Sequence, residues 1–377
     1  MKIAIMTQPL GNNYGGIMQA WALQQVLKRM GHQPVTIDRQ PDQPSFAYKA
    51  ARLAYRAGMK AIGKRKAPIN IERNISRHSS IALQHTQEFI SKNINLSSQI
   101  HSTLDLITHF QKEGYEAAIV GSDQTWRPKY SPNIYNFFLD FLKEDSCKKI
   151  AYASSFGVDN WEFTRQQTKR CSALAGQFAS ISVREASGIE LCQNYLKVKA
   201  AHVLDPTMLL NKNDYEALIG QQRINTDASG IYTYLLDETQ EKLEIVKRTC
   251  QLLNESAYSN QARHGLELGI SGNLTDYTMP MVEDWLSGFA NAKFVITDSF
   301  HGMVFSIIFR KPFLVIRNSK RGATRFISLL NQLNLSSRLI EDKELFDFSI
   351  IAAPLSDIDT QIKELQKYSM KILSSSL

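Results

Sequence analysis

The feature that most constrains the fold of this chain is the alternation of short apolar runs with segments of helical spacing. Runs 2–7, 116–121 and 148–154 have the length and apolar character of buried strands, whereas 16–30 carries apolar residues at helical spacing. Alternation of this kind is typical of βαβ units, in which helical crossovers join parallel strands. We therefore predict an α/β fold built on parallel sheets.

The alternation restarts in the second half of the chain. Asp205-Pro206 follows a strand-like run and breaks the pattern, which places a domain boundary near residue 207. The predicted limits are 1–207 for an N-terminal Rossmann-like domain, 208–335 for a C-terminal one and 336–377 for a helical segment. Two such domains should face a cleft, with ligands at the carboxyl ends of the strands.

The composition is that of a globular protein, with 377 residues of which 43% are hydrophobic and 21% charged. No run of about 18 apolar residues suggests a membrane span, and the first residues lead straight into a strand, so a cytoplasmic location is expected. The four cysteines are widely spaced without a C-x-x-C pair, which predicts neither a disulfide framework nor a metal site.

A net charge of +8 points to anionic partners without choosing among them. Basic residues are concentrated in an insertion near 46–77, where 46–66 has the spacing of a basic amphipathic helix. This helix is either a solvated face or a peripheral contact with an anionic membrane or a lipid-linked diphosphate. No nucleic-acid partner is predicted. The basic residues are Lys49, Arg52, Arg56, Lys60, Lys64, Lys66, Arg65, Arg73 and Arg77.

Loops that follow strands hold the first candidate binding groups. The glycine-rich turn at 11–16 is not a G-x-G-x-x-G motif, so it predicts an anion or polyol site, or a plain tight turn, rather than a dinucleotide site. A polar segment ending at Trp126 suits sugar binding, although an Asx turn with a buried tryptophan is an equal alternative. The acceptor candidates are Asn12, Asn13, Tyr14, Gly15, Asp123, Gln124 and Trp126.

An arginine and a histidine are the strongest candidates for chemistry. Arg184 follows a strand beside Ser182, where it could bind a carboxylate or phosphate, or instead pair with Asp205 or Glu185. His301 lies in the turn from strand to helix, three residues after Asp298, and could transfer protons there or merely satisfy the local backbone.

These segments together resemble the polysaccharide pyruvyl transferase family. The resemblance runs in family order through Asn13-Tyr14-Gly15, 121–126, 182–184, Asp205-Pro206-Thr207 and 298–302. It implies a GT-B-like arrangement of the two domains, and transfer of a pyruvyl group from phosphoenolpyruvate to two hydroxyls of a sugar, or of a lipid-linked saccharide, as a cyclic ketal in bacterial surface polysaccharide biosynthesis. It also implies phosphoenolpyruvate as donor substrate and no separate cofactor.

The resemblance assigns roles to particular residues. Arg184 would bind the donor, His301 would be the catalytic or phosphate-contacting imidazole, and Asp298 would assist it, with Ser299 and Gly302 close to the donor. Some family members carry an arginine where this chain has Ser299, so the missing positive charge must come from elsewhere. Candidates are Arg317, Lys320, Arg321 and Arg325. A nucleotide-sugar glycosyltransferase and a non-catalytic sugar-binding protein remain the alternatives.

Overall fold

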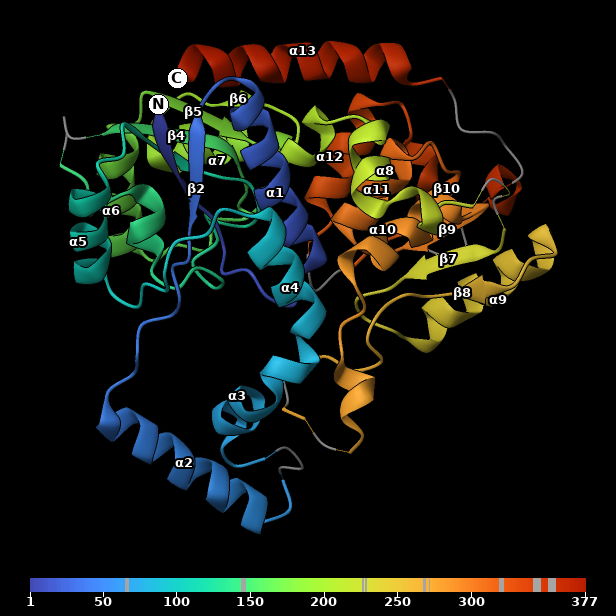
Figure 1. The fold of residues 1–377 in the computed structure, drawn as a ribbon, viewed down its shortest axis with the longest axis horizontal. Coiled ribbons are helices and arrows are strands. Elements are labelled where there is room, and N and C mark those ends of the chain that lie inside the picture. Colours follow the sequence, from blue (N-terminus) through green and yellow to red (C-terminus); the bar gives the residue numbers. More distant parts are fainter. Residues whose placement is uncertain are drawn as a thin grey trace.

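The computed structural model of the chain has two parallel β-sheets side by side, each covered by helices (Figure 1). The prediction of an α/β fold with two Rossmann-like units is confirmed. The structure describes residues 1–64, 68–143, 147–225, 227, 229–266, 269–270, 272–318, 322–341, 347–351 and 357–377.

The first sheet has six parallel strands in the order β2-β1-β3-β4-β5-β6. Because β1 lies between β2 and β3, the winding direction reverses at β1, and such switch points form ligand crevices at the carboxyl ends of the strands. The strands are β1 (Lys2–Met6), β2 (Gln33–Ile37), β3 (Ala117–Val120), β4 (Lys148–Ser154), β5 (Ser180–Val183) and β6 (Ala201–His202).

Alternate residues of these strands enter two different cores. Ile3 and Ile5 pack in a core with α1 and α4, whereas Ala4 and Met6 pack with α5 and α6 on the opposite face. We call this sheet and its helices the first lobe. The helices are α1 (Tyr14–Arg29), α4 (Gln84–Asn93), α5 (Thr103–Glu113), α6 (Arg165–Ala175) and α7 (Ala186–Leu191).

The second sheet has five parallel strands in the order β11-β10-β9-β7-β8. It forms the second lobe together with five helices. The strands are β7 (Ile231–Tyr234), β8 (Ala257–Tyr258), β9 (Phe294–Thr297), β10 (Phe313–Ile316) and β11 (Leu339–Ile340). The helices are α8 (Lys212–Ile219), α9 (Gln240–Leu253), α10 (Val282–Asn291), α11 (Phe300–Ile308) and α12 (Thr324–Gln332).

Short helical turns complete the connections. They are η1 (Ile134–Phe138), η2 (Cys192–Leu196), η3 (Pro206–Leu209), η4 (Gln221–Arg223), η5 (Leu274–Tyr277), η6 (Ser336–Arg338) and η7 (Phe348–Ile351).

A single apolar core extends across both lobes, through α1 of the first lobe and α10 and α11 of the second. Tyr14, the first residue of α1, stacks on Trp285 of α10 with ring centroids 5.0 Å apart. The Tyr14 hydroxyl donates a hydrogen bond to the carbonyl of Pro280 over 2.7 Å. The start of α1 is therefore fixed against the second lobe, which positions the glycine-rich turn that precedes it.

The last helix, α13 (Asp359–Ser376), returns to the first lobe (Figure 1). Ser369 accepts a hydrogen bond from the Leu204 amide at 3.0 Å, and Lys148 donates to the carbonyl of Leu377 at 3.2 Å. The two chain ends consequently lie close together. The domain limits 1–207, 208–335 and 336–377 stay a prediction. The structure adds that the final helix contacts the first lobe.

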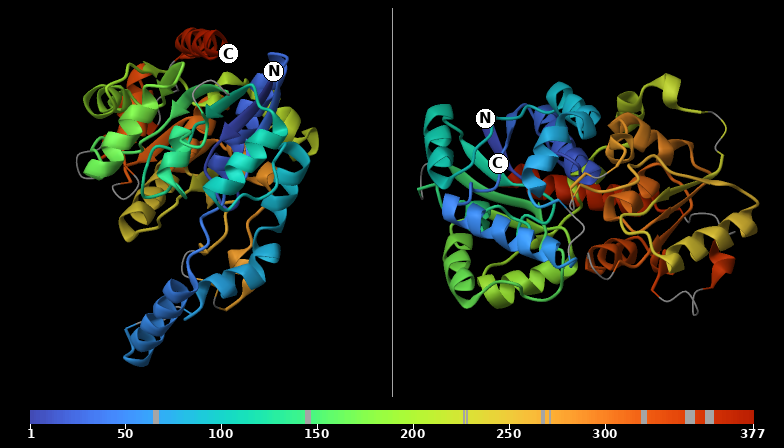
Figure 2. Two further views of the ribbon diagram at one scale, coloured as in Figure 1. Left: turned by 90° about the vertical axis from the view of Figure 1, so that its left-hand side faces the viewer. Right: turned by 90° about the horizontal axis from the view of Figure 1, so that it is seen from below.

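The predicted basic insertion forms two helices, α2 (Phe46–Ala61) and α3 (Ile71–Ala82), which project from the body of the protein (Figure 2). We call this pair the arm. Its predicted basic residues Arg65 and Lys66 lie outside the described residues. Among the helices in the described ranges, none has the length and apolar character needed to span a bilayer.

Candidate functional site

A cleft of about 560 Å³ opens between the lobes at the carboxyl ends of both sheets. Most of the residues that the sequence singled out line it, although they come from loops far apart in the chain. Those residues are Asn12, Asn13, Tyr14, Asp123, Gln124, Asp298, Ser299, His301 and Arg325.

His301 lies in the first turn of α11, and Ser299 caps this helix by accepting a hydrogen bond from the Gly302 amide at 3.4 Å. The imidazole packs directly on α1 of the other lobe. A β-carbon built on Gly15 would lie only 2.0 Å from His301 Nδ1, so no other residue type fits at position 15 without moving the ring. The glycine-rich turn thus provides the space that the histidine occupies.

The carboxylate beside His301 is that of Asp205, which is fully buried. His301 Nε2 lies 3.6 Å from Asp205 Oδ2, and Arg184 Nη1 pairs with the same oxygen at 2.7 Å. Ser122 and Thr207 donate to this carboxylate through their hydroxyls at 2.7 and 2.6 Å. Of the two partners left open for Arg184, the structure therefore selects Asp205 over Glu185.

This environment lowers the pKa of Asp205. Burial by itself would raise the pKa, but the His301 ring, Arg184 and Thr207 together outweigh burial and lower it well below its usual value.

The free energy of unfolding should depend on pH in the acid range because of this buried carboxylate. Because its pKa is lowered in the folded state, Asp205 stabilises the protein above its usual pKa of 3.8, and this stability is lost as the pH falls below that value. We expect the free energy of unfolding, measured by denaturant titration from neutral pH into the acid range, to fall less steeply below pH 3.8 in Asp205→Asn than in the wild type. Equal slopes would contradict this role.

Two guanidinium groups approach the ring of Phe300, the first residue of α11. The Cζ atoms of Arg184 and Arg325 lie 4.6 and 5.6 Å from its centroid, within the range of cation–π contacts. Burial and the neighbouring Arg184 lower the pKa of Arg325 to about 10, so that it stays charged at neutral pH. Arg325 lines the cleft directly, whereas Arg184 lies beneath the lining.

The buried cluster is not fully hydrogen-bonded. Among the described residues, Arg184 Nε and Nη2 and His301 Nε2 are buried without a hydrogen-bond partner. Buried donors of this kind are costly unless something binds them. Together with the amides at the start of α11, they make this end of the cleft suited to an anion.

The loop after β3 holds Asp123 and Gln124 in place. Asp123 adopts a left-handed backbone conformation, with φ of 77°, and its carboxylate accepts a hydrogen bond from the Gln124 amide. The Gln124 side chain rests on Gly157, whose β-carbon would lie 2.0 Å from Gln124 Oε1. Glu185, which had no assigned role, fixes this neighbouring loop by accepting from the amides of Phe156 and Gly157.

Asp298 makes different contacts from those that its predicted role requires. Its carboxylate accepts hydrogen bonds from the Leu236 and Asp237 amides at 2.6 and 3.2 Å. It also pairs with Lys242 at 2.6 Å and accepts from Asn318 at 3.0 Å. The first two donors belong to the loop after β7, Lys242 belongs to α9 and Asn318 follows β10. Asp298 thereby positions the turn that carries His301.

Besides Arg184, the predicted site residues that do not line the cleft are Gly15, Gly302, Trp126, Ser182 and Arg317. Trp126 is fully buried and stacks on Phe138 with centroids 4.9 Å apart, so its ring is not open to a sugar. Ser182 is buried and bonds the backbone of the irregular strand β4. Arg317 pairs with Glu341 at the surface, at 3.3 Å. The candidates Lys320 and Arg321 lie outside the described residues.

The sequence reasoning missed one wall of the cleft. This wall is aromatic and polar, and it is formed mainly by the segment between β8 and α10, where no periodic pattern marks it. Its residues include Tyr234, Gln261, His264 and Tyr277, and Tyr130 of the first lobe lines the cleft as well. Within the ranges that the structure describes, no three His, Cys, Asp or Glu side chains are grouped as metal ligands would be.

The two parallel sheets and the cleft between them define a two-lobed α/β protein with a GT-B-like arrangement. A family model described as polysaccharide pyruvyl transferase matches residues 13–320, so the chain belongs to the polysaccharide pyruvyl transferase family. The predicted family is thereby confirmed. No curated protein matches the chain significantly.

Two solved structures share this fold at low sequence identity. UDP-GlcNAc 2-epimerase from Methanocaldococcus jannaschii is 12% identical with a TM-score of 0.51, and the alignment covers 100% of both chains. MnaA from S. aureus, in its co-structure with UDP, is 11% identical with a TM-score of 0.51, and the alignment covers 100% of this chain and 97% of that one. At this identity the likeness concerns the fold alone.

Proposed function

We propose that the protein transfers the pyruvyl group of phosphoenolpyruvate to two hydroxyls of a sugar, forming a cyclic ketal in bacterial surface polysaccharide biosynthesis. Family membership supports pyruvyl transfer. The observation that carries the proposal is the cluster of His301, Arg184 and Arg325 around Phe300 at one end of the cleft.

The donor has a phosphate and a carboxylate, and this end of the cleft has matching cations. Arg325 reaches the cleft directly, and its planar guanidinium suits bidentate binding of either group. It supplies the positive charge that Ser299 does not. Arg184 reinforces the positive potential from beneath, while the amides at the start of α11 can bind a phosphate oxygen.

His301 is the proposed acid. A proton delivered to the methylene carbon of phosphoenolpyruvate gives an oxocarbenium-like centre at the adjacent carbon, and one sugar hydroxyl adds there and loses its proton. The C–O bond to phosphate then breaks, and a second hydroxyl adds with loss of its proton, so that the products are the ketal and inorganic phosphate. Asp205, whose Oδ2 lies 3.6 Å from His301 Nε2, orients the imidazole.

The acceptor is proposed to bind at the first lobe's edge of the cleft. Asn12, Asn13, Asp123 and Gln124 present amide and carboxylate groups there, and amides of this turn are free at the start of α1. Tyr130 on the same side, and the rings of Tyr234 and Tyr277 on the second lobe, suit the apolar face of a sugar ring. Phosphoenolpyruvate and a sugar or lipid-linked saccharide are the proposed substrates, with the enzyme at the cytoplasmic side.

The direct test is incubation of purified protein with phosphoenolpyruvate and a panel of sugars and lipid-linked saccharides, with phosphate as the readout. We expect phosphate release that depends on one acceptor, with a ketal-bearing product detectable by mass spectrometry. Tight binding of a nucleoside diphosphate without phosphate release from any acceptor would instead favour the glycosyltransferase alternative.

Replacing the two proposed donor-site residues should stop turnover. We expect His301→Ala and Arg184→Ala each to lower kcat by about 100-fold or more, because they remove the acid and part of the cationic site. The measurement is the rate of phosphate release, with circular dichroism to show that each variant is folded. Arg317→Ala should release phosphate at a near-normal rate. If its kcat fell as far as that of Arg184→Ala, Arg317 would be assigned to donor binding instead.

A further inference from the structure

Helix α2 is the most exposed helix with a marked apolar face. None of its side chains is buried, and the large apolar side chains on or beside it are strongly exposed. Phe46 is 86% exposed, Tyr55 68% and Ile62 62%. Isolated exposed apolar residues are ordinary, but a continuous set on one helix marks a contact surface.

The apolar residues share one side of the helix. At 100° per residue, six alanines fill one side of the helix, and Phe46 and Tyr55 lie at its two opposite edges, with Ile62 beside Tyr55. Arg52 and Arg56 point the other way, toward α3, where both pair with Glu72 at 3.2 and 2.7 Å. The alanines are Ala47, Ala50, Ala51, Ala54, Ala57 and Ala61.

The charge of this helix is of one sign. α2 contains Lys49, Arg52, Arg56 and Lys60 and no acidic residue. Lys49 and Lys60 are exposed and lie beside Arg56 on the basic side of the helix. An apolar side opposite a basic side is the arrangement of helices that lie in the plane of an anionic membrane surface.

We propose that α2 binds an anionic lipid surface, with its alanine-rich side and the rings of Phe46 and Tyr55 in the headgroup region. A second copy of the chain is the less suitable occupant, because both copies would present a helix whose charged residues are all basic. The arm projects from the same side as the carboxyl ends of the strands in the first sheet (Figure 1), so the cleft would face the lipid. This proposal does not depend on the proposed reaction.

The arm is also joined to the cleft. Asn74 of α3 exchanges two hydrogen bonds with the backbone of Ile270, at 2.6 and 3.1 Å, and Met279 donates to the carbonyl of Ala82 at 2.8 Å. Tyr277, next to these contacts, packs in a small core with Ala82 and Ile270 and lines the cleft. Membrane binding by α2 would therefore place the aromatic wall of the cleft, which includes Tyr277, close to the lipid surface.

The test is co-flotation of the full-length protein with vesicles, which requires no catalysis. We expect binding to vesicles of equal parts phosphatidylcholine and phosphatidylglycerol, little binding to phosphatidylcholine alone, and weakening with salt. Absence of binding to the anionic vesicles would overturn the proposal.

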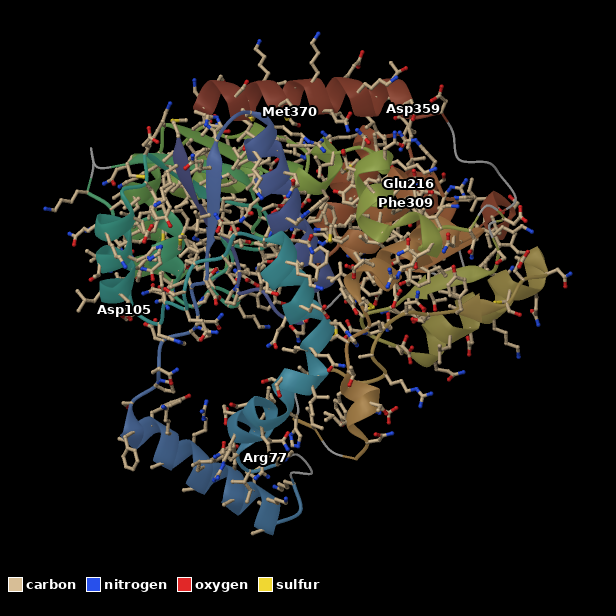
Figure 3. The ribbon with its side chains drawn as sticks, in the orientation of Figure 1. Arg77, Asp105, Glu216, Phe309, Asp359 and Met370 are labelled. Atoms are coloured by element: carbon tan, nitrogen blue, oxygen red, sulfur yellow. The ribbon has the colours of Figure 1, made fainter. Side chains whose placement is uncertain are left out.

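Two double variants separate the apolar and the ionic contributions. Phe46→Ser with Tyr55→Ser, and Lys49→Glu with Lys60→Glu, should each weaken vesicle binding by about 10-fold or more. The matched control is Lys363→Glu with Lys367→Glu on α13, which makes the same change in net charge at the opposite end of the molecule from the arm, where Arg77 is labelled (Figure 3).

The control variant should bind like the wild type. An equal loss in it would mean that net charge alone governs binding, and would overturn the role of α2. Analytical ultracentrifugation supplies the second readout: we expect no mass change on Phe46→Ser with Tyr55→Ser. A dimer that this variant dissociates would assign the surface to a second copy instead.

Discussion

Gly15→Ala should lower kcat/KM for phosphate release from phosphoenolpyruvate by about 100-fold or more, because a misplaced catalytic group costs rate even when it is still present. The added β-carbon would lie 2.0 Å from His301 Nδ1, so the imidazole must leave its position between α1 and Asp205. The substitution tests the position of His301 without changing any of its atoms.

Stability should not explain the loss. Gly15 lies in α1, and alanine is favoured over glycine inside helices by about 1 kcal/mol. The matched control is Gly11→Ala in the same turn, where no atom lies within 4 Å of the added carbon and near-normal kinetics are expected. A Gly15→Ala enzyme with normal kcat/KM would show that the position of His301 is not required.

Asp205→Ala should lower the free energy of unfolding by about 3–5 kcal/mol, because it leaves the Arg184 guanidinium buried without its partner. The side chains of Arg184 and Asp205 are almost completely excluded from solvent and their charged atoms are 2.7 Å apart. Chemical denaturation at neutral pH would measure the loss.

A surface ion pair provides the comparison. Glu341→Ala removes the partner of Arg317, but both side chains are about half exposed, so a change of less than about 1 kcal/mol is expected. If Asp205→Ala cost no more than Glu341→Ala, the buried cluster would contribute little to stability, and its role would lie in orienting His301 alone.

Most of the fold follows from local sequence patterns, because buried parallel strands are apolar and their crossover helices are amphipathic. The patterns failed where an element was too short or too polar to show them. β8 and β11 have two residues each, which is shorter than any alternation can reveal. α6 was missed because only Cys171 and Ala175 of its residues are buried.

The site was predictable to the extent that it follows the topology. Residues directly after β1, β3 and β9 were found because parallel strands bring their carboxyl ends to one edge. Contacts between the lobes could not be found in this way. The space at Gly15 for His301, and the choice of Asp205 rather than Asp298 as its neighbour, depend on how distant segments pack. Trp126 was ambiguous for the same reason, since burial cannot be inferred from its own loop.

The return of α13 to the first lobe makes the second lobe an insertion between β6 and the last helix. The chain therefore passes from the first lobe to the second and ends on a helix that contacts both, because Asp359 of α13 also pairs with Arg310 of the second lobe. Both chain ends then lie on the first lobe, so fluorophores attached at the two ends would report on this lobe and not on the cleft. Motion of the cleft has to be followed by a label on the second lobe, such as one on α9.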